Sequence, residues 1–137
     1  MLQKQSGLEI DVEESASAVF RCGGGEKTFP IYTHTDFLQY PPVHRFKIVG
    51  DGGRLEADLN STEYAIWLGD ERIKSGEFPE FARNGMFIQE LEDFLAAIRN
   101  GREVKIGLQN GIDTLRMAMA IKKADAEKRE VALSEIG

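Results

Sequence analysis

A histidine and an aspartate separated by one residue have the side-chain types and spacing best suited to chemistry in this sequence. His34 and Asp36 follow Tyr32 at steps of two residues, and side chains in a β-strand return to the same face at every second residue. An imidazole, a carboxylate and a tyrosine on one face can hold a polar ligand such as a sugar. We therefore take Tyr32, His34 and Asp36 as the candidate substrate-binding residues.

A metal centre is the weaker interpretation of the same pair. A catalytic zinc site takes three protein ligands, and the other histidine, His44, lies beyond the break at Pro41–Pro42. A metal-dependent enzyme that uses His34 and Asp36 therefore ranks below a solvated or ligand-facing sheet surface, and we expect no metal site.

Other catalytic and cofactor motifs are missing from the sequence. It contains no G-x-S-x-G elbow, no G-x-G-x-x-G fingerprint and no Walker motif, which are the local patterns of serine hydrolases and nucleotide-binding folds. The lone cysteine, Cys22, ends an apolar alternating segment and is expected to be a small core residue and not a nucleophile. We predict no catalytic and no cofactor-binding residue in this chain.

Length and charge narrow the class of protein. A chain of 137 residues fits a single domain, residues 1–137. The net charge of −6 argues against nucleic-acid binding, which rests on clustered lysine and arginine. No segment has the apolar length of a signal peptide or a membrane span, and one cysteine cannot form an internal disulfide. We expect a soluble cytoplasmic protein with no nucleic-acid or membrane partner.

The elements that must position Tyr32, His34 and Asp36 are strands joined by glycine turns. Glycine clusters at 23–25 and 50–53 favour hairpins because glycine reaches positive φ without steric cost. Alternating apolar residues flank each turn, and further strand-forming segments occupy 63–68 and 72–75. The pattern predicts an open, mostly antiparallel sheet of about six strands, a common sheet size.

The sequence changes character after residue 83. Apolar residues recur there at the helical spacing, with Asn84 as the expected N-cap and Gly101 after the C-terminus. A second helix is expected near Asn110, with Asp113 completing a partial capping box, and Val131–Leu133 is expected to form a closing strand. We predict an α+β fold in which the two helices pack on one sheet face and bury Phe87, Leu91, Phe94, Ile98, Leu115 and Met119.

Two segments carry a family resemblance. IVGDGGRL at 48–55 combines with FIQELEDFLAAIRNG at 87–101, and NGIDTL follows at 110–115. In this order the motifs resemble the C-terminal domain of the glucose–fructose oxidoreductase/inositol dehydrogenase (Gfo/Idh/MocA) family, and the similarity runs from about Leu8 to Leu133.

The resemblance implies an NAD(P)-dependent oxidoreductase that acts on sugars or cyclitols and carries a Rossmann domain before this one. This chain lacks the dinucleotide fingerprint, the E-K-P lysine and the D-x-x-x-H helix of such enzymes, so no catalytic or cofactor residue transfers to it. NAD(P) is implied for a full-length relative only. The chain is expected to be a substrate-side and oligomerisation domain, a fragment or truncated product that is inactive alone, with a separate or missing Rossmann domain as partner.

A second interpretation keeps the chain independent. It would then be a stand-alone module that binds a sugar-like ligand or a protein partner on the sheet face. In either case two helices leave one sheet face open, which carries the row from Tyr32 to Leu38 or the row from Ile31 to Phe37. Because exposed apolar faces are unusual on monomers, we expect a homodimer through the open face, centred on the long strand and residues 46–59.

Overall fold

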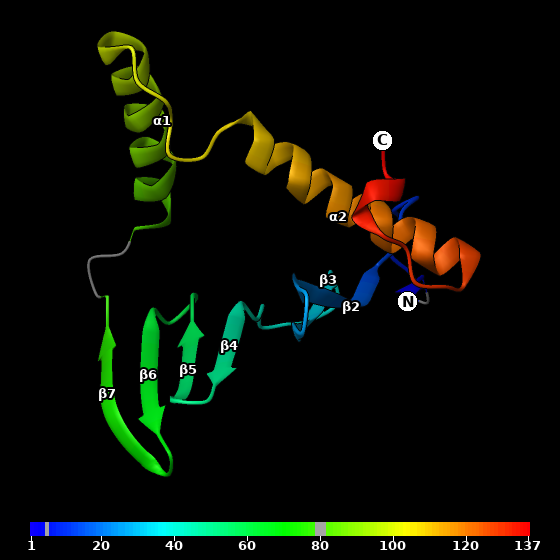
Figure 1. Ribbon diagram of the computed structural model, residues 1–137, viewed down its shortest axis with the longest axis horizontal. Coiled ribbons are helices and arrows are strands. Elements are labelled where there is room, and N and C mark those ends of the chain that lie inside the picture. The colour runs from blue at the N-terminus through cyan, green and yellow to red at the C-terminus, as the bar shows by residue number, and fades with distance from the viewer. Residues whose placement is uncertain (5, 79–81) are drawn as a thin grey trace. The chain divides into compact units, whose positions relative to one another are not determined.

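The computed structural model describes residues 1–4, 6–78 and 82–137 and confirms an α+β fold with two C-terminal helices. Its strands form two antiparallel sheets, one of three strands and one of four, in place of the single predicted sheet (Figure 1). The chain divides into a first unit, residues 1–38 with 105–137, and a second unit, residues 39–104.

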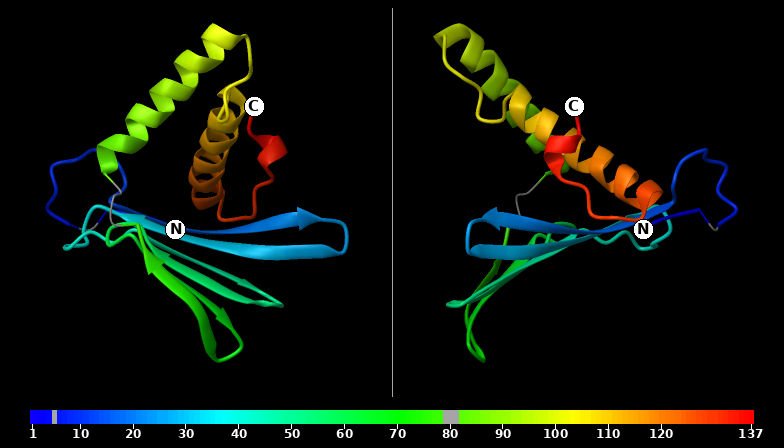
Figure 2. Two further views of the ribbon diagram at one scale, coloured as in Figure 1. Left: turned by 90° about the vertical axis from the view of Figure 1, so that its left-hand side faces the viewer. Right: turned by 45° about the vertical axis from the view of Figure 1, so that its right-hand side comes forward.

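The sheet of the first unit is built on one long hairpin. Strands β1 (Leu2–Gln3), β2 (Ser15–Gly24) and β3 (Lys27–Asp36) lie in that order. Figure 2 shows β2 and β3, in blue, as a long paired ribbon. The predicted glycine turn joins β2 to β3. Gly23 has φ of 104°, and a Cβ there would collide with the carbonyl oxygen of Lys27. Only glycine fits this backbone, so the turn fixes the pairing of the whole hairpin.

The sheet of the second unit is a four-stranded meander. It runs through β4 (Arg45–Gly50), β5 (Gly53–Asp58), β6 (Glu63–Leu68) and β7 (Glu71–Glu77). The predicted Asp51–Gly52 hairpin is confirmed. Gly53, with φ of 148°, admits no side chain, because a Cβ would strike the carbonyl oxygen of Trp67 on β6. A register shift between β6 and β7 is a bulge that lets residues three apart on β7 share a face.

Helix α1 (Arg83–Asn100) ends as predicted but begins differently. Gly101 adopts φ of 61° and ψ of 31° and its N–H points to the carbonyl oxygens of Ala97 and Ile98, which is the left-handed termination that glycine favours. The N-cap is Ala82, without a side-chain cap, and not Asn84.

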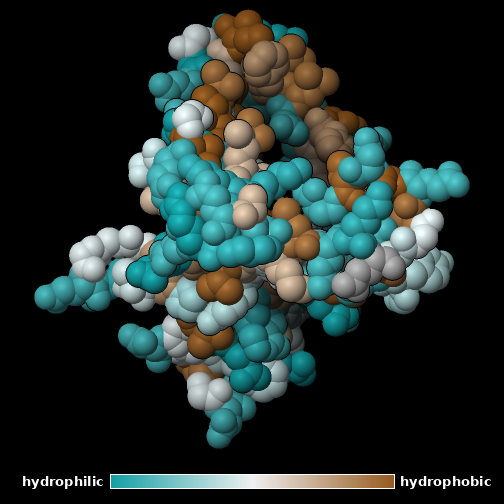
Figure 3. Space-filling model, turned by 90° about the vertical axis from the view of Figure 1, so that its right-hand side faces the viewer, coloured by the Kyte–Doolittle hydropathy of each residue, from teal (hydrophilic) through white to brown (hydrophobic). Residues whose placement is uncertain are grey.

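The predicted burial of the apolar stripes is wrong for this chain. On α1 the exposed fractions are 57% for Phe87, 58% for Leu91, 52% for Phe94 and 64% for Ile98. On the second helix they are 61% for Leu115 and 48% for Met119. Figure 3 shows hydrophobic side chains, in brown, standing at the surface. Helical spacing of apolar residues indicates a face that is stabilised by contact with another surface, but it does not show that the same chain provides that surface.

Helix α2 (Leu108–Glu127) starts two residues before the predicted Asn110. The N-cap is Gly107, whose N–H donates to the Asn110 side-chain oxygen at 3.0 Å, so Asn110 rather than Asp113 closes the first turn. An ion pair of 3.2 Å joins Lys122 on α2 to Glu13, which lies just before β2. Neither helix in the described residues is long and apolar enough to span a membrane.

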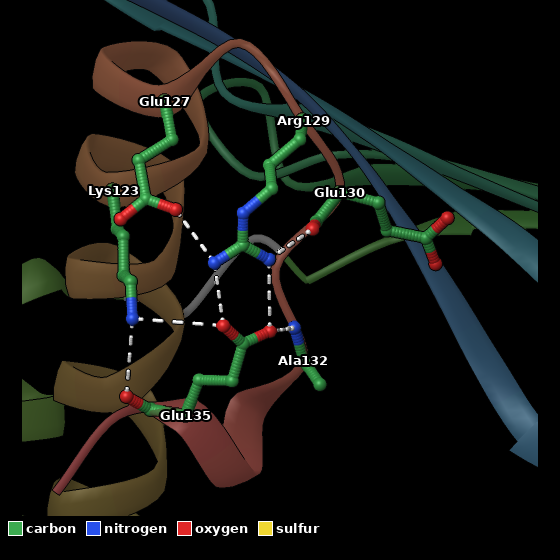
Figure 4. Close-up of polar contacts among 6 residues, drawn as sticks. All are labelled: Lys123, Glu127, Arg129, Glu130, Ala132 and Glu135. Carbon is green, nitrogen blue, oxygen red and sulfur yellow. Dashed lines mark hydrogen bonds and ion pairs between the residues drawn. The ribbon is translucent and has the colours of Figure 1, made fainter.

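The C-terminal residues form a helical turn and not the predicted strand at Val131–Leu133. The 3₁₀ helix η1 (Leu133–Glu135) is held by Arg129, whose guanidinium donates to both Glu135 carboxylate oxygens at 3.1 and 2.6 Å (Figure 4). Glu127 pairs with the same guanidinium at 2.6 Å, and the Ala132 N–H donates to Glu135 at 2.9 Å. Because these bonds fold the tail back onto the end of α2, it offers no edge for pairing.

This cluster has a direct electrostatic signature. The Arg129 hydrogen bonds, followed by the Ala132 N–H, lower the pKa of Glu135 from 4.5 to about 2. The same contacts raise the pKa of Arg129. A carboxyl with a lowered folded-state pKa stabilises the fold above its unfolded value and loses that contribution as pH falls.

Acidification should therefore loosen the tail between about pH 4.5 and about 2, the unfolded and folded values of Glu135. Carbon-detected NMR titration of the Glu135 carboxyl should report the lowered pKa, and the melting temperature should fall across the same window. Glu135→Gln should remove that part of the pH dependence. Glu26→Gln, at the exposed β2–β3 turn, controls for lost negative charge. Titration of Glu135 at its ordinary value would contradict the cluster.

Candidate functional site

Three side chains on the first sheet form a hydrogen-bonded series. His34 on β3 lies directly opposite Ser17 on β2. The Ser17 Oγ lies 2.8 Å from His34 Nδ1, and His34 Nε2 lies 2.9 Å from Asp36 Oδ2. His34 and Asp36 were predicted to share one face, and the structure brings both together with a serine that was not predicted.

The chemistry of the three groups decides which way the hydrogen bonds run. An ionised carboxylate can only accept a hydrogen bond, so Asp36 requires the proton on His34 Nε2. In the neutral imidazole Nδ1 is then the acceptor, and the Ser17 hydroxyl must donate to it. The Asp36 side chain is only 4% exposed, while that of His34 is 53% exposed. A sheltered carboxylate thus orients a solvent-accessible base beside a hydroxyl.

The predicted Tyr32 shares this face but not the hydrogen bonds. It lies two residues from His34 on β3, is 75% exposed and sits opposite Val19, which is 66% exposed. A hollow of about 350 Å³ continues along the hairpin, lined by Val19, Phe20, Arg21, Thr28, Phe29 and Pro30. The face therefore offers an apolar and aromatic surface next to the Ser17–His34–Asp36 series.

A signal for Ser17 was present in the sequence. The turn is centred between Gly25 and Glu26. Ser17 lies eight residues before Gly25 and His34 lies eight residues after Glu26, so the two are paired. Opposed residues in an antiparallel pair share a face, so placing the centre of the turn would have found the pair. Side-chain alternation within one strand could not, because it carries no information about the neighbouring strand.

The second sheet presents a charged face with a hollow of about 820 Å³. Its side chains come from matching register positions on β4 to β7. Arg45 lies opposite Asp58 and donates to its carboxylate at 2.6 Å. Arg45, followed by the N–H groups of Asn60 and Ser61, lowers the pKa of Asp58. Ala65 and Ser75, which carry small side chains, lie opposite each other among the lining residues.

The single tryptophan anchors one end of this charged face. The guanidinium of Arg54 lies 4.3 Å from the Trp67 ring centre, and that of Arg72 lies 6.0 Å from it. The bulge in β7 aligns Arg72 with Trp67. Arg54 also contacts the Glu56 carboxylate at 3.2 Å, so the face holds cations and anions in close alternation.

Potential metal ligands form no cluster among the residues that the structure describes. Within residues 1–4, 6–78 and 82–137, no three histidine, cysteine or acidic side chains lie close enough to hold a metal ion. Cys22 is a free, partly exposed thiol.

Comparison with known proteins identifies the family. The profile described as "Oxidoreductase family, C-terminal alpha/beta domain" of the Gfo/Idh/MocA group matches residues 31–133. This chain belongs to that family. The Gfo/Idh/MocA C-terminal domain is thus an α+β unit here, as its resemblance implied.

A curated relative gives a more specific likeness. Myo-inositol 2-dehydrogenase of Thermotoga maritima is 31% identical over 97 residues, which cover 67% of this chain and 28% of the dehydrogenase. No solved structure matches the chain. The Gfo/Idh/MocA match begins at residue 31, inside β3, so Ser17 lies outside the matched residues, whereas His34 and Asp36 lie within them.

Trp67 provides a spectroscopic test of the charged face, because it is the one tryptophan in the chain. Arg54→Ala removes the guanidinium over the indole, a contact that stabilises exposed sites by roughly 0.5–1 kcal/mol. We expect a loss of that order in the free energy of unfolding and a red-shifted Trp67 emission. Lys74→Ala, on the opposite face of β7, should change neither. Unchanged emission in Arg54→Ala would place the guanidinium elsewhere.

Proposed function

We propose that this Gfo/Idh/MocA domain is the substrate-side and oligomerisation domain of an NAD(P)-dependent oxidoreductase acting on a sugar or cyclitol. The family match over residues 31–133 carries the proposal, and the likeness to a myo-inositol 2-dehydrogenase supports the substrate class. As a fragment or truncated product the chain has no oxidoreductase activity alone. The lone cysteine supports a cytoplasmic location, since disulfides belong to oxidising compartments.

The substrate side is the row of Tyr32, His34 and Asp36. An exposed phenol, a half-exposed imidazole and a carboxylate supply both donors and acceptors for a hydroxyl-rich ligand. The cofactor would come from a Rossmann domain. Phosphate binding uses a glycine turn between a strand and a helix N-terminus, whereas the glycine turns at Gly25 and Gly52 each join two strands.

A domain exchange tests the activity. Residues 31–133 would replace the matching segment of the Thermotoga maritima myo-inositol 2-dehydrogenase, and the chimera would be assayed for NAD(P) reduction with cyclitols and sugars. We expect turnover with at least one of them, because the relative's cofactor domain supplies what this chain lacks. Calorimetric titration of the 137-residue chain with NADH and NADPH should show no binding. A folded chimera that binds NADH and oxidises no polyol would refute the proposal.

The oligomerisation role rests on the charged face of the second sheet. A two-fold axis parallel to the strands, between β5 and β6, would lay β4 of one copy over β7 of the other. Arg45 of each copy would then face Glu77 of its partner, because both residues occupy one register row. In the same way Arg54 would face the partner's Trp67. A face that pairs with itself in this manner suits an isologous homodimer.

Such a dimer should be weak and sensitive to salt. Four strands of six or seven residues span roughly 20 Å by 20 Å, which is small for a specific interface. The charge pairs must therefore supply much of the binding, and salt screens exposed pairs. The expected product is a dimer at micromolar concentrations that dissociates as ionic strength rises.

Charge reversal tests the dimer. Arg45→Glu should raise the dimer dissociation constant at least about tenfold, since close interfacial charge pairs are coupled by about 1.5 kcal/mol or more. Arg45→Glu combined with Glu77→Arg should restore association, because the two charges exchange places. Sedimentation equilibrium of the 15.3 kDa chain measures both. Lys74→Glu, on the other sheet face, serves as the control. A wild-type chain that stays monomeric at low salt, or a double variant that fails to recover, rejects this interface.

The alternative is a stand-alone module that binds a sugar-like ligand or a protein partner on a sheet face. The hollow of about 820 Å³ on the charged face favours it, because small-molecule sites are concave and a few hundred to a thousand Å³ in size. Direct sugar binding by the isolated chain, together with an inactive chimera, would select this reading.

A further inference from the structure

We propose that Ser17 is a base-activated nucleophile and that the Ser17–His34–Asp36 series forms an acyl-transfer site for small esters. The inference stands apart from the oxidoreductase proposal, because it concerns the isolated chain and needs no cofactor. It begins from the two short hydrogen bonds that join Ser17 to His34 and His34 to Asp36, at 2.8 and 2.9 Å.

Each member of the series has a defined part. A serine hydroxyl is a weak nucleophile until an adjacent base accepts its proton, and the base works best when a third group orients it. His34 accepts the Ser17 hydroxyl hydrogen bond at Nδ1, and Asp36 holds the Nε2–H. A second bond fixes Asp36 itself, since its Oδ1 accepts the Leu38 N–H at 2.7 Å. Asp36 is therefore a positioning residue, and Ser17 and His34 are the catalytic pair.

Strand pairing makes the arrangement rigid. Ser17 and His34 are direct cross-strand partners in the β2–β3 ladder, and their separation is set by backbone hydrogen bonds and not by loop geometry. Groups held on regular elements keep near-attack geometry better than groups on loops. The Asp36 side chain is 4% exposed, which protects the orienting bond from competition by water.

The chemical steps balance without an added reagent. The Ser17 Oγ attacks the ester carbonyl carbon while its proton passes to His34 Nδ1. The carbon–oxygen bond to the leaving alcohol then breaks, and His34 returns the proton to that alcohol. A water molecule, deprotonated by His34, attacks the acyl-serine and releases the carboxylic acid, which restores the Ser17 hydroxyl.

The surroundings indicate the substrate class. Tyr32 and Val19 form the next cross-strand pair on the same face, at 75% and 66% exposure. The hollow of about 350 Å³ begins at Val19. On the Ser17 face it continues to the next cross-strand pair, Arg21 and Pro30, whereas Phe20 and Phe29 alternate to the opposite face. A short apolar acyl chain can lie along Val19, Tyr32 and Pro30 with its carbonyl at Ser17.

One feature limits the rate. The Ser17 N–H already donates to the Met1 carbonyl oxygen at 2.9 Å, so it is not free to stabilise the oxyanion. Loss of one oxyanion donor costs about 10²–10³ in rate in serine enzymes. Slow turnover is therefore expected, and a probe that reacts once and stays attached is the sharper measurement.

An alkyl fluorophosphonate provides that test on the full chain. Ser17 Oγ should bond to phosphorus as fluoride leaves, with one label per chain, located at Ser17 by peptide mass spectrometry. Ser17→Ala should abolish labelling. His34→Gln should lower its rate constant at least about 100-fold, the contribution of a general base. Asp36→Asn should lower it to a smaller extent and leave Ser17 as the labelled residue.

Matched controls separate activation from simple exposure. Ser15 lies on the same strand and face, opposite Asp36, and Ser15→Ala should label at the wild-type rate. Circular dichroism of each variant should retain the wild-type spectrum, because Ser17 is half-buried and His34 exposed, and neither side chain takes part in the backbone strand ladder. Labelling at several serines, or a His34→Gln rate equal to that of the wild type, would overturn the proposal. Release of p-nitrophenol from its butyrate ester with a Ser17-dependent burst would extend it to turnover.

Discussion

Cross-strand register is the constraint on which both candidate surfaces depend. Gly23 and Gly53 each take a positive φ at a point where a Cβ would strike a neighbouring carbonyl oxygen, and each fixes one hairpin. A slip of one residue turns every side chain of a strand to the opposite face. The Ser17–His34 contact and the Arg45–Asp58 pair therefore exist only while these turns hold their present alignment.

The sequence predicted those features that depend on one segment at a time. Alternation placed Tyr32, His34 and Asp36 on one face, and glycine clusters located both hairpins. Features that depend on two distant segments were missed, such as Ser17 opposite His34. The predicted strand at Val131–Leu133 was wrong for the same reason. Its residue types favour a strand, but a side-chain hydrogen bond between Arg129 and Glu135 folds the segment back. Helix α2 begins earlier than predicted because Gly107 is its N-cap, and Asn110 takes the partner position that was predicted for Asp113.

The exposed apolar stripes of the two helices could not be predicted from the sequence for a different reason. Full burial of a phenylalanine or leucine side chain stabilises a fold by about 1.5–3 kcal/mol, and Phe94 and Leu91 are more than half exposed. Much of that potential stabilisation is therefore unrealised within the described residues. The chain spans 28% of the dehydrogenase that it resembles. The apolar periodicity of the helices indicates faces that favour contact with another surface. A further domain or a second copy of the chain would supply such a surface.

The charged side chains of the two sheets also differ in how they are arranged. On the second sheet, Arg45 contacts Asp58 at 2.6 Å and Arg54 contacts Glu56 at 3.2 Å. Opposite charges therefore alternate on this face, which suits recognition of another charged surface. On the first sheet the sheltered Asp36 carboxylate faces a half-exposed histidine, and one hydroxyl completes the series. Because the two sets lie in different units and share no partner, substitutions in one should act independently of the other. Association and chemistry can therefore be measured separately in the same chain.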